Sequence, residues 1–330
     1  MTADTELLTV RDLSISFLTP QGVAEAVSGS SFSISPGERV GMVGESGSGK
    51  SLTGLSLLGL TPAAAEVSGS ILLDGNDVLS MPDAELRRVR GQQVSMIFQE
   101  PMTALDPVFT VGQQISATFR AHQGASRKEA KERSIELLQE VGIPEPKRRF
   151  SEYPHQLSGG MRQRAMIAMA LVCEPQLLIA DEPTTALDVT IQAQVLDLIV
   201  QLSEDRGTAV LLITHDLGVV AETCERVLTM YAGQIVEACS VDEALEHPLH
   251  PYTSGLLAAI PRTGTAAEKL RSIPGRVPAP VDFPAGCRFG PRCPHFVDNC
   301  AEPQPLRPAL LDRLVRCDRH EELDLPGAVP

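Results

Sequence analysis

The sequence predicts an α/β fold organised around a phosphate-binding loop, and three features support this prediction. A short apolar strand over Arg39–Val43 leads into a glycine-rich loop, and a helix over residues 51–58 follows it. Two further apolar strands, at residues 177–182 and 209–214, have polar or charged side chains at their ends. A helical pattern fills residues 111–142, ahead of these two strands. This order of elements is typical of a nucleotide-binding α/β unit.

Length and charge limit the classes of protein that the chain can represent. Its 330 residues suggest about two domains. The 28 basic and 42 acidic residues give a net charge of −14, which argues against nucleic acid as the main partner. The sequence has no apolar run near the roughly 18 residues of a membrane span, and its start does not resemble a signal peptide. We therefore expect a soluble, cytoplasmic chain that works at a membrane only through other subunits.

The chain begins with strands that precede the α/β unit. Residues 7–18 alternate partly between apolar and polar side chains, and residues 26–34 read as a second strand after a polar turn. We expect these strands to pair in antiparallel fashion. Phe17 lies in the first of them, and its ring could be either a core aromatic or a platform on which adenine stacks.

The glycine-rich loop fits the phosphate-binding pattern of two glycines with four residues between them, followed by Lys and Ser. Backbone N–H groups of such a loop can surround a polyphosphate, while Lys50 reaches the β- and γ-phosphates and Ser51 ligates Mg²⁺. The alternative is a glycine-rich turn that matches by chance, but the strand before it and the helix after it argue against that. The predicted loop consists of Gly44, Glu45, Ser46, Gly47, Ser48, Gly49, Lys50 and Ser51.

The strand that begins at residue 94 ends on the polar amide of Gln99. The helical block at residues 111–142 follows it and interrupts the α/β pattern, which predicts an inserted helical subdomain over about residues 100–175. Within that range, Gly159 and Gly160 precede an apolar helix. A glycine pair at a helix start can bind an anion or serve simply as a turn.

The strand at residues 177–182 ends in Asp181 and Glu182. One carboxylate can hold a magnesium ion and the next can orient or deprotonate an attacking water, although a charged strand end at the surface is the plainer interpretation. Asp188 begins the next helix. His215 ends the following strand, where an imidazole could reach a γ-phosphate.

These motifs occur in a fixed order that resembles the ATP-binding subunits of ABC transporters over residues 7–260. The Leu-Ser-Gly-Gly sequence at residues 157–160, combined with a phosphate loop, is highly specific. The resemblance implies a P-loop NTPase of the ABC ATPase type, with a RecA-like core, an antiparallel β-subdomain and an inserted helical subdomain. The motifs that carry the resemblance are residues 44–51, Gln99, residues 157–163, residues 177–182, Asp188 and His215.

The resemblance also implies roles for single residues. Phe17 would stack on adenine, and the loop residues would bind the phosphates. Ser51, Gln99 and Asp181 would contact Mg²⁺. Glu182 would polarise the attacking water. Gln99 and His215 would be the other two catalytic residues.

His215 would contact the γ-phosphate. Ser158, Gly159 and Gly160 would contact the ATP bound to a partner subunit. Asp188 would bridge the two subunits, which would face each other head to tail with one ATP between each loop and the opposite signature. The partner could be a second copy or a related ATPase.

The composition changes beyond residue 260, where residues 261–330 are rich in proline and contain four of the seven cysteines. A proline-rich segment buries little core, so a metal crosslink has an obvious structural purpose. Intervals of five, six and sixteen residues separate the four cysteines, and this spacing alone leaves zinc and iron–sulfur both open. These cysteines are Cys287, Cys293, Cys300 and Cys317.

This tail is similar to the C-terminal extension of ATPases that drive dipeptide and oligopeptide import. In that family the matching cysteines hold a [4Fe-4S] cluster, which we therefore expect here. The alternatives are Zn²⁺ and reduced cysteines without a metal. The implied function is an ATP-hydrolysing translocase subunit on the cytoplasmic face of the membrane, with two permease subunits and an external peptide-binding protein as partners. Import of nickel, glutathione or another small solute is the nearer alternative, and a soluble ATPase acting on nucleic acid or ribosomes is the more distant one.

Overall fold

The structure is a computed structural model, in which residues 6–99, 104–185, 188–260, 272–310 and 313–328 are described. The chain divides into two compact units, and each unit combines segments that are distant in sequence. The first unit contains residues 1–7, 35–38 and 80–211. The second unit contains residues 8–34, 39–79 and 212–330.

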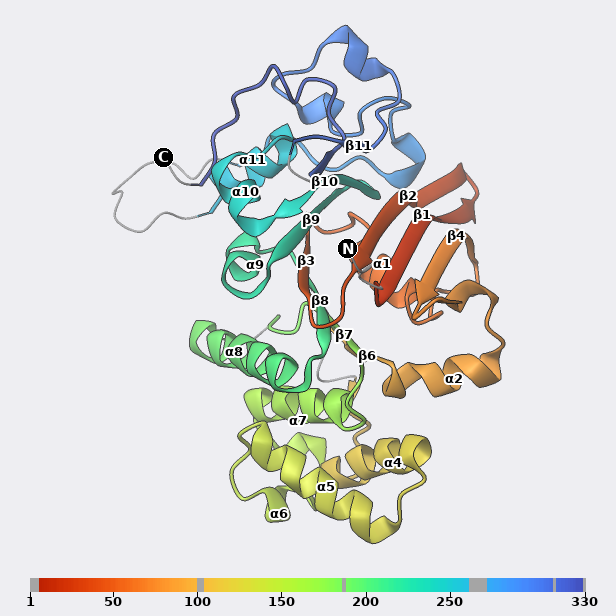
Figure 1. Cartoon of the computed structure of the whole chain (residues 1–330), viewed down its shortest axis with the longest axis vertical. Coiled ribbons are helices and arrows are strands. Elements are labelled where there is room, and N and C mark those ends of the chain that lie inside the picture. The colour runs from red at the N-terminus through yellow and green to blue at the C-terminus, as the bar shows by residue number, and fades with distance from the viewer. Residues whose placement is uncertain (1–5, 100–103, 186–187, 261–271, 311–312, 329–330) are drawn as a thin grey trace, which may run out of the picture. The chain divides into compact units, whose positions relative to one another are not determined.

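Helices make up most of the first unit. In Figure 1, α4, α5 and α7 lie together in its yellow and green part. The elements are α2 (Asp83–Gln92), β6 (Val94–Ile97), α4 (Val111–Gln123), α5 (Arg127–Glu140), α6 (Pro146–Arg149), the 3₁₀ helix η2 (Pro154–Gln156), α7 (Gly159–Leu171), β7 (Leu177–Asp181) and α8 (Val189–Arg206). Strand β8 (Ala209–Thr214) begins in this unit and ends in the second.

Capping residues explain where these helices begin. Thr110 and Gln113 form a reciprocal capping box at the start of α4, and Ser126 and Glu129 form another at the start of α5. The helical pattern predicted for residues 111–142 is confirmed by these two helices.

A parallel pair of buried strands forms the other part of the first unit. β6 pairs with β7 in parallel, in the order β8-β7-β6, and every residue of the two strands is buried. Such continuous apolar runs are typical of parallel strands that are covered on both faces. The strand predicted to end on Gln99 stops at Ile97, two residues earlier.

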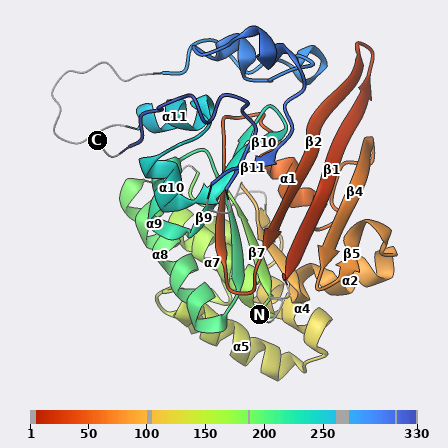
Figure 2. The same ribbon diagram turned by 45° about the horizontal axis from the view of Figure 1, so that its top comes forward.

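The second unit contains a four-stranded antiparallel sheet, which Figure 2 shows with β1, β2 and β4 side by side. β1 pairs with both β2 and β4, and Leu13, Ile15 and Val27 lie fully buried on the sheet. The predicted antiparallel start of the chain is therefore confirmed. The strands are β1 (Leu8–Thr19), β2 (Gly22–Ile34), β4 (Ala65–Leu73) and β5 (Asn76–Asp77), and the 3₁₀ helix η1 (Val78–Ser80) follows them.

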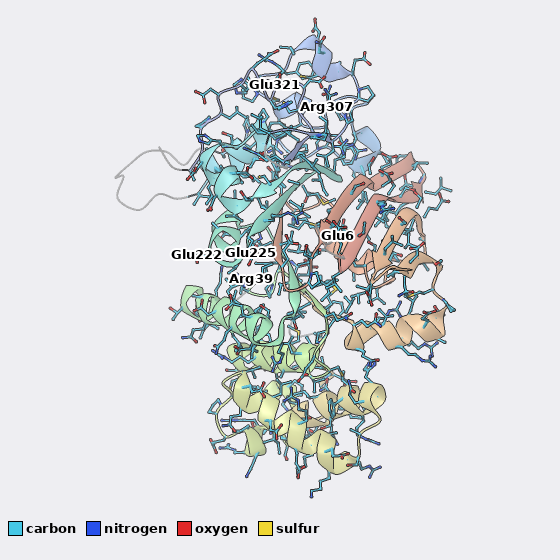
Figure 3. The ribbon with its side chains drawn as sticks, viewed as in Figure 1. Glu6, Arg39, Glu222, Glu225, Arg307 and Glu321 are labelled. Carbon is cyan, nitrogen blue, oxygen red and sulfur yellow. The ribbon has the colours of Figure 1, made fainter. Side chains whose placement is uncertain are left out.

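Further strands of the second unit follow the order β11-β12-β10-β9-β3. β3 pairs with β9 in parallel, and Arg39 of β3 forms an ion pair of 2.6 Å with Glu225, just before β9 (Figure 3). The strands are β3 (Arg39–Val43), β9 (Arg226–Tyr231), β10 (Gln234–Ser240), β11 (Arg307–Pro308) and β12 (Leu314–Val315). The helices are α1 (Lys50–Ser56), α9 (Leu217–Thr223), α10 (Val241–Glu246) and α11 (Pro251–Ala258). Helix α1 ends two residues before the predicted end at residue 58.

Residues 272–328 contain the short 3₁₀ helices η3 (Pro280–Asp282), η4 (Gly290–Arg292) and η5 (Asp298–Ala301). Phe289 packs in a buried cluster with Tyr231 and Tyr252, so this segment shares a hydrophobic core with β9 and α11. Glu237, fully buried in β10, accepts a hydrogen bond of 2.7 Å from Arg313. Within the described ranges, no helix combines the length and apolarity needed to cross a membrane.

Candidate functional site

The predicted phosphate loop lies in the second unit, between the end of β3 and the start of α1. Gly44, Gly47 and Gly49 have φ angles of 157°, 79° and 96°, which L side chains rarely adopt. A Cβ atom added at Gly49 would lie 2.7 Å from the carbonyl oxygen of Ala26 in β2. The glycines are therefore required by the path of the backbone and by its close approach to a neighbouring strand.

Lys50 is the best-defined polar group of the loop. Its side chain is buried, and its Nζ donates to the carbonyl oxygens of Gly44 at 2.7 Å and of Glu45 at 3.1 Å. A Cβ added at Gly47 would meet no atom within 4 Å, so the loop faces open space at that point. A positive charge held beside an open glycine-rich backbone fits the phosphates of a nucleotide.

Three other predicted residues belong to the same unit. Phe17 lies in β1, where it pairs with Ala24 of β2 and Ala65 of β4, and its side chain is half-buried. Ser51 is half-buried in the first turn of α1. His215 is exposed directly after β8.

The carboxylate pair lies in the first unit, at the end of β7. Asp181 is buried there, and Glu182 follows it with a φ of 44°, in the left-handed region that costs a non-glycine residue about 1–3 kcal/mol. One oxygen of Glu182, Oε2, accepts hydrogen bonds from Gln99 Nε2 at 3.1 Å and from Thr185 Oγ1 at 2.8 Å. Two donors and a strained backbone thus fix the direction of this carboxylate.

The signature segment also belongs to the first unit. Ser158 caps α7 by accepting a hydrogen bond from the N–H of Met161 at 3.3 Å, and Gly159 and Gly160 form the first turn of the helix. A cap of this kind leaves backbone N–H groups of the first turn directed out of the helix, where they can contact an anion. Asp188 caps α8 in the same way, through the N–H of Ile191 at 3.0 Å.

The structure brings some of the predicted residues together within one unit. Gln99 and Glu182 are hydrogen-bonded, and buried Gln163 of α7 donates to the carbonyl oxygen of Pro183, just after the carboxylate pair. Thr185, which bonds Glu182, has no role in the sequence analysis. A hydroxyl three residues after the carboxylate was a signal that could have identified it.

Sequence analysis also missed two residues that bond the phosphate loop. Tyr252 and Arg292 both contact Glu45, from positions far along the chain. Nothing in the sequence around Tyr252 or Arg292 indicates that either residue contacts a loop more than 200 positions earlier.

The predicted iron–sulfur cluster is wrong. Among the described residues, no three or more His, Cys, Asp or Glu side chains form a group that could hold a metal ion. Burial raises the pKa of Cys293 to about 11 and that of Cys317 to about 12. The cluster had been predicted from Cys287, Cys293, Cys300 and Cys317.

The reason for this error lies in the packing of residues 272–328. The proline-rich composition predicts a segment that buries little core, and therefore a metal crosslink. Instead, Phe289 supplies a buried aromatic core, and the buried side chains of Arg288, Arg292 and Arg313 each pair with a carboxylate elsewhere in the unit. These contacts stabilise the segment in the way that a metal would.

Two family descriptions match the chain: "ABC transporter" over residues 27–185, and "Oligopeptide/dipeptide transporter, C-terminal region" over residues 236–300. The chain is 52% identical to the oligopeptide transport ATP-binding protein AppD of Bacillus subtilis, over 96% of this chain and 97% of that protein. It is 48% identical to the oligopeptide transport ATP-binding protein OppD of Escherichia coli, over 94% of this chain and 92% of that protein. These names describe ATP-binding proteins of oligopeptide transport.

Solved structures give the same fold. The dimeric structure of MJ0796, a bacterial ABC transporter cassette, matches with a TM-score of 0.63 at 28% identity, over 71% of this chain and 98% of that chain. A post-hydrolysis structure of MJ0796 with ADP and Pi matches with a TM-score of 0.64 at 27% identity, over the same shares of the two chains. The predicted ABC ATPase fold is therefore confirmed.

ATP-binding subunits of ABC transporters are ATPases whose activity is coupled to transport, so ATP and Mg²⁺ are the ligands that the motif residues must accommodate. The glycine conformations, the buried Lys50 and the oriented Glu182 fit these ligands. The similarity to the relatives extends over nearly the whole chain. On this evidence the chain belongs to the ABC transporter family, among its oligopeptide transport ATP-binding proteins.

Proposed function

We propose that this chain is the ATP-binding and ATP-hydrolysing subunit that powers the import of dipeptides or oligopeptides through an ABC transporter. The observation that carries the proposal is the near-full-length similarity to proteins named for oligopeptide transport, at 52% identity over 96% of the chain. The match of residues 236–300 to the oligopeptide/dipeptide transporter C-terminal region supports the same substrate class. Import of nickel, glutathione or another solute has no such support.

The roles proposed for the site residues are those that the resemblance implies. Bound Mg²⁺ neutralises phosphate charge and polarises the terminal phosphate. Ser51, Gln99 and Asp181 are the proposed ligands of this ion. Glu182 accepts a proton from the attacking water, and its carboxylate is already directed by Gln99 Nε2 and by Thr185 Oγ1.

Other proposed roles concern the nucleotide bound to the same subunit. Phe17 stacks on adenine, and His215 contacts the γ-phosphate. The loop of residues 44–51 surrounds the phosphates, with Lys50 leaving the carbonyl oxygens of Gly44 and Glu45 to meet them.

The proposed assembly contains two ATPase subunits. Ser158, Gly159 and Gly160 contact the ATP of the other subunit, and Asp188 bridges the pair; the dimeric structure of the similar cassette MJ0796 supports such an arrangement. Two permease subunits and an extracytoplasmic peptide-binding protein complete the importer, which places this chain at the cytoplasmic face of the membrane.

We further propose a functional division of the chain near residue 260. Residues 7–260 form the nucleotide-binding domain, with a RecA-like core, an antiparallel β-subdomain and a helical subdomain over about residues 100–175. Residues 261–330 form a cysteine-rich C-terminal extension with a regulatory role. The contacts of Arg292 with the phosphate loop support such a role.

The substitution Glu182→Gln tests the function. It keeps the side-chain volume but removes the base, so ATP binding should persist while ATP hydrolysis and peptide uptake fall by about 10²–10⁴-fold. The matched control is Glu136→Gln, which changes an exposed glutamate on α5 of the same unit and should leave both rates unchanged. The measurement is uptake of a labelled oligopeptide by cells in which the variant replaces the native gene. Normal uptake with Glu182→Gln, or after deletion of the gene, would contradict the proposal.

A further inference from the structure

Glu45, the second residue of the phosphate loop, is held by two side chains from outside the loop. Its backbone N–H donates to the hydroxyl oxygen of Tyr252 at 2.8 Å. Its carboxylate accepts two hydrogen bonds from Arg292, from Nη1 to Oε2 at 2.9 Å and from Nη2 to Oε1 at 3.1 Å. The paired geometry is the strong, directional form of an arginine–carboxylate contact. The loop is therefore fixed at three polar groups of one residue.

Tyr252 has a rigid position. It is fully buried, and its ring lies 4.7 Å from that of Tyr231 and 5.4 Å from that of Phe289, measured between centroids. The hydroxyl oxygen of this buried side chain accepts the hydrogen bond from the N–H of Glu45, so the backbone at the start of the loop is tied to α11.

Arg292 is equally well ordered. Only 6% of its side chain is exposed, and its Nε donates to the carbonyl oxygen of Pro274 at 2.8 Å. Its guanidinium also lies 5.7 Å from the ring centroid of Tyr231. A guanidinium ordered in this way before the carboxylate binds loses little entropy in holding it.

The pairing has a consequence for the charge at the nucleotide site. Glu45 follows Gly44 directly, in a loop that receives a triphosphate, and an uncompensated carboxylate there would repel the anion. The guanidinium of Arg292 cancels that charge while it fixes the side chain. Its effect on the nucleotide therefore operates through Glu45 and needs no direct contact with the phosphates.

We propose that Arg292, together with Tyr252, is a positioning residue for ATP binding, because it orients the phosphate loop and neutralises the carboxylate of Glu45. The inference rests on the proposed function, since it assumes that the loop binds ATP. It makes nucleotide affinity a property that Tyr252 and Arg292 control. A change at either residue then alters the KM for ATP more than kcat.

The test is a double-mutant cycle of nucleotide binding, carried out on the full chain. Equilibrium binding of a fluorescent ATP analogue with Mg²⁺ is measured for the wild type, Arg292→Gln, Glu45→Gln and the double variant. Arg292→Gln leaves Glu45 charged and uncompensated, and should weaken binding about tenfold, or about 1.4 kcal/mol, with a larger loss at low salt. The double variant has no charge to compensate, and should bind within about threefold of the wild type. Arg292→Lys should recover part of the loss.

The matched control is Arg288→Gln. Arg288 comes from the same segment, is buried to a similar degree, and pairs with a carboxylate, that of Glu25, which lies outside the loop. Its removal should lower the unfolding midpoint as much as Arg292→Gln does, measured without nucleotide, and should leave nucleotide affinity unchanged. A merely structural role for Arg292 would make the two variants alike in both measurements.

Two results would overturn the inference: wild-type affinity in Arg292→Gln, or a double variant that binds as weakly as that single variant. Should Arg292→Gln prevent folding, Arg292→Lys and Glu45→Gln still decide between charge and structure, because both keep a side chain of similar size. Failure of the wild type to bind the analogue would count instead against the proposed ATPase function, so the two failures are distinguishable.

Discussion

His250 makes the stability of the second unit depend on pH. It is buried, and its Nδ1 accepts a hydrogen bond from the N–H of Tyr252 at 3.1 Å, so it caps α11 as a neutral ring. Burial, and then the positive charge of Arg316, lower the pKa of His250 to about 3. The folded chain therefore resists protonation at this ring.

The magnitude follows from proton linkage. The unfolded imidazole titrates near pH 6.5, so the unfolded state binds the extra proton between that pH and about pH 3, and stability falls as the pH falls through this window. The penalty is RT ln(1 + 10^(6.5−pH)), which is about 0.2 kcal/mol at pH 7.0 and about 1.4 kcal/mol at pH 5.5. We expect a loss of about 1.2 kcal/mol between these two conditions.

The measurement is urea unfolding at both pH values, followed by tyrosine fluorescence. The chain has three tyrosines and no tryptophan, and Tyr231 and Tyr252 lie in the cluster beside His250, so the signal reports on this unit. The reference is His250→Asn, whose side-chain oxygen can still cap α11 but does not titrate. Subtracting its pH dependence removes the contributions of the other groups. An equal loss of stability in the wild type and in this variant would refute the reasoning.

Three further substitutions test packing and charge. Gly49→Ala places a Cβ atom 2.7 Å from a carbonyl oxygen of β2 at a φ of 96°, and should weaken binding of the ATP analogue at least about tenfold. Arg313→Met removes the partner of fully buried Glu237 and should cost about 3–5 kcal/mol in urea unfolding, much of which Glu237→Gln should restore in the double variant. Gly41→Ala brings a Cβ atom to 2.4 Å from Cγ1 of Val220 in α9, and should cost about 1–3 kcal/mol unless Val220→Ala accompanies it. Unchanged unfolding midpoints in the last two would contradict the packing described.

The elements around the loop could be predicted because their signals are local. Three runs of apolar residues predicted β3, β7 and β8. A glycine-rich sequence followed by Lys50 predicted the loop and the start of α1. Capping pairs such as Ser126 and Glu129 mark helix starts for the same reason, since both partners lie within one turn.

The contacts that orient the site could not be predicted in this way. Glu45 and Arg292 are 247 positions apart, and no pattern in a single sequence connects them. The left-handed backbone of Glu182 depends on the packing around β7, which residue type does not reveal. The cysteines led to a wrong prediction because their type suggested metal ligands, whereas Cys287 and Cys293 pack against the buried cluster that contains Phe289. The roles of the individual site residues remain predictions.

The second unit is built from segments that are far apart in the sequence, and this affects how the chain folds during synthesis. This unit joins residues 8–34 and 39–79 to the chain from residue 212 onward. Its last described pairings are those of β12 with β10 and of the N–H of Ala328 with the carbonyl oxygen of Leu245. The strands that precede the loop therefore leave the ribosome long before the residues that complete their unit. At about 5–20 residues per second, β3 waits on the order of ten seconds or more for β9, the strand with which it pairs. Folding of the second unit should thus wait for the synthesis of its later residues, and chaperones should contact the growing chain during that interval.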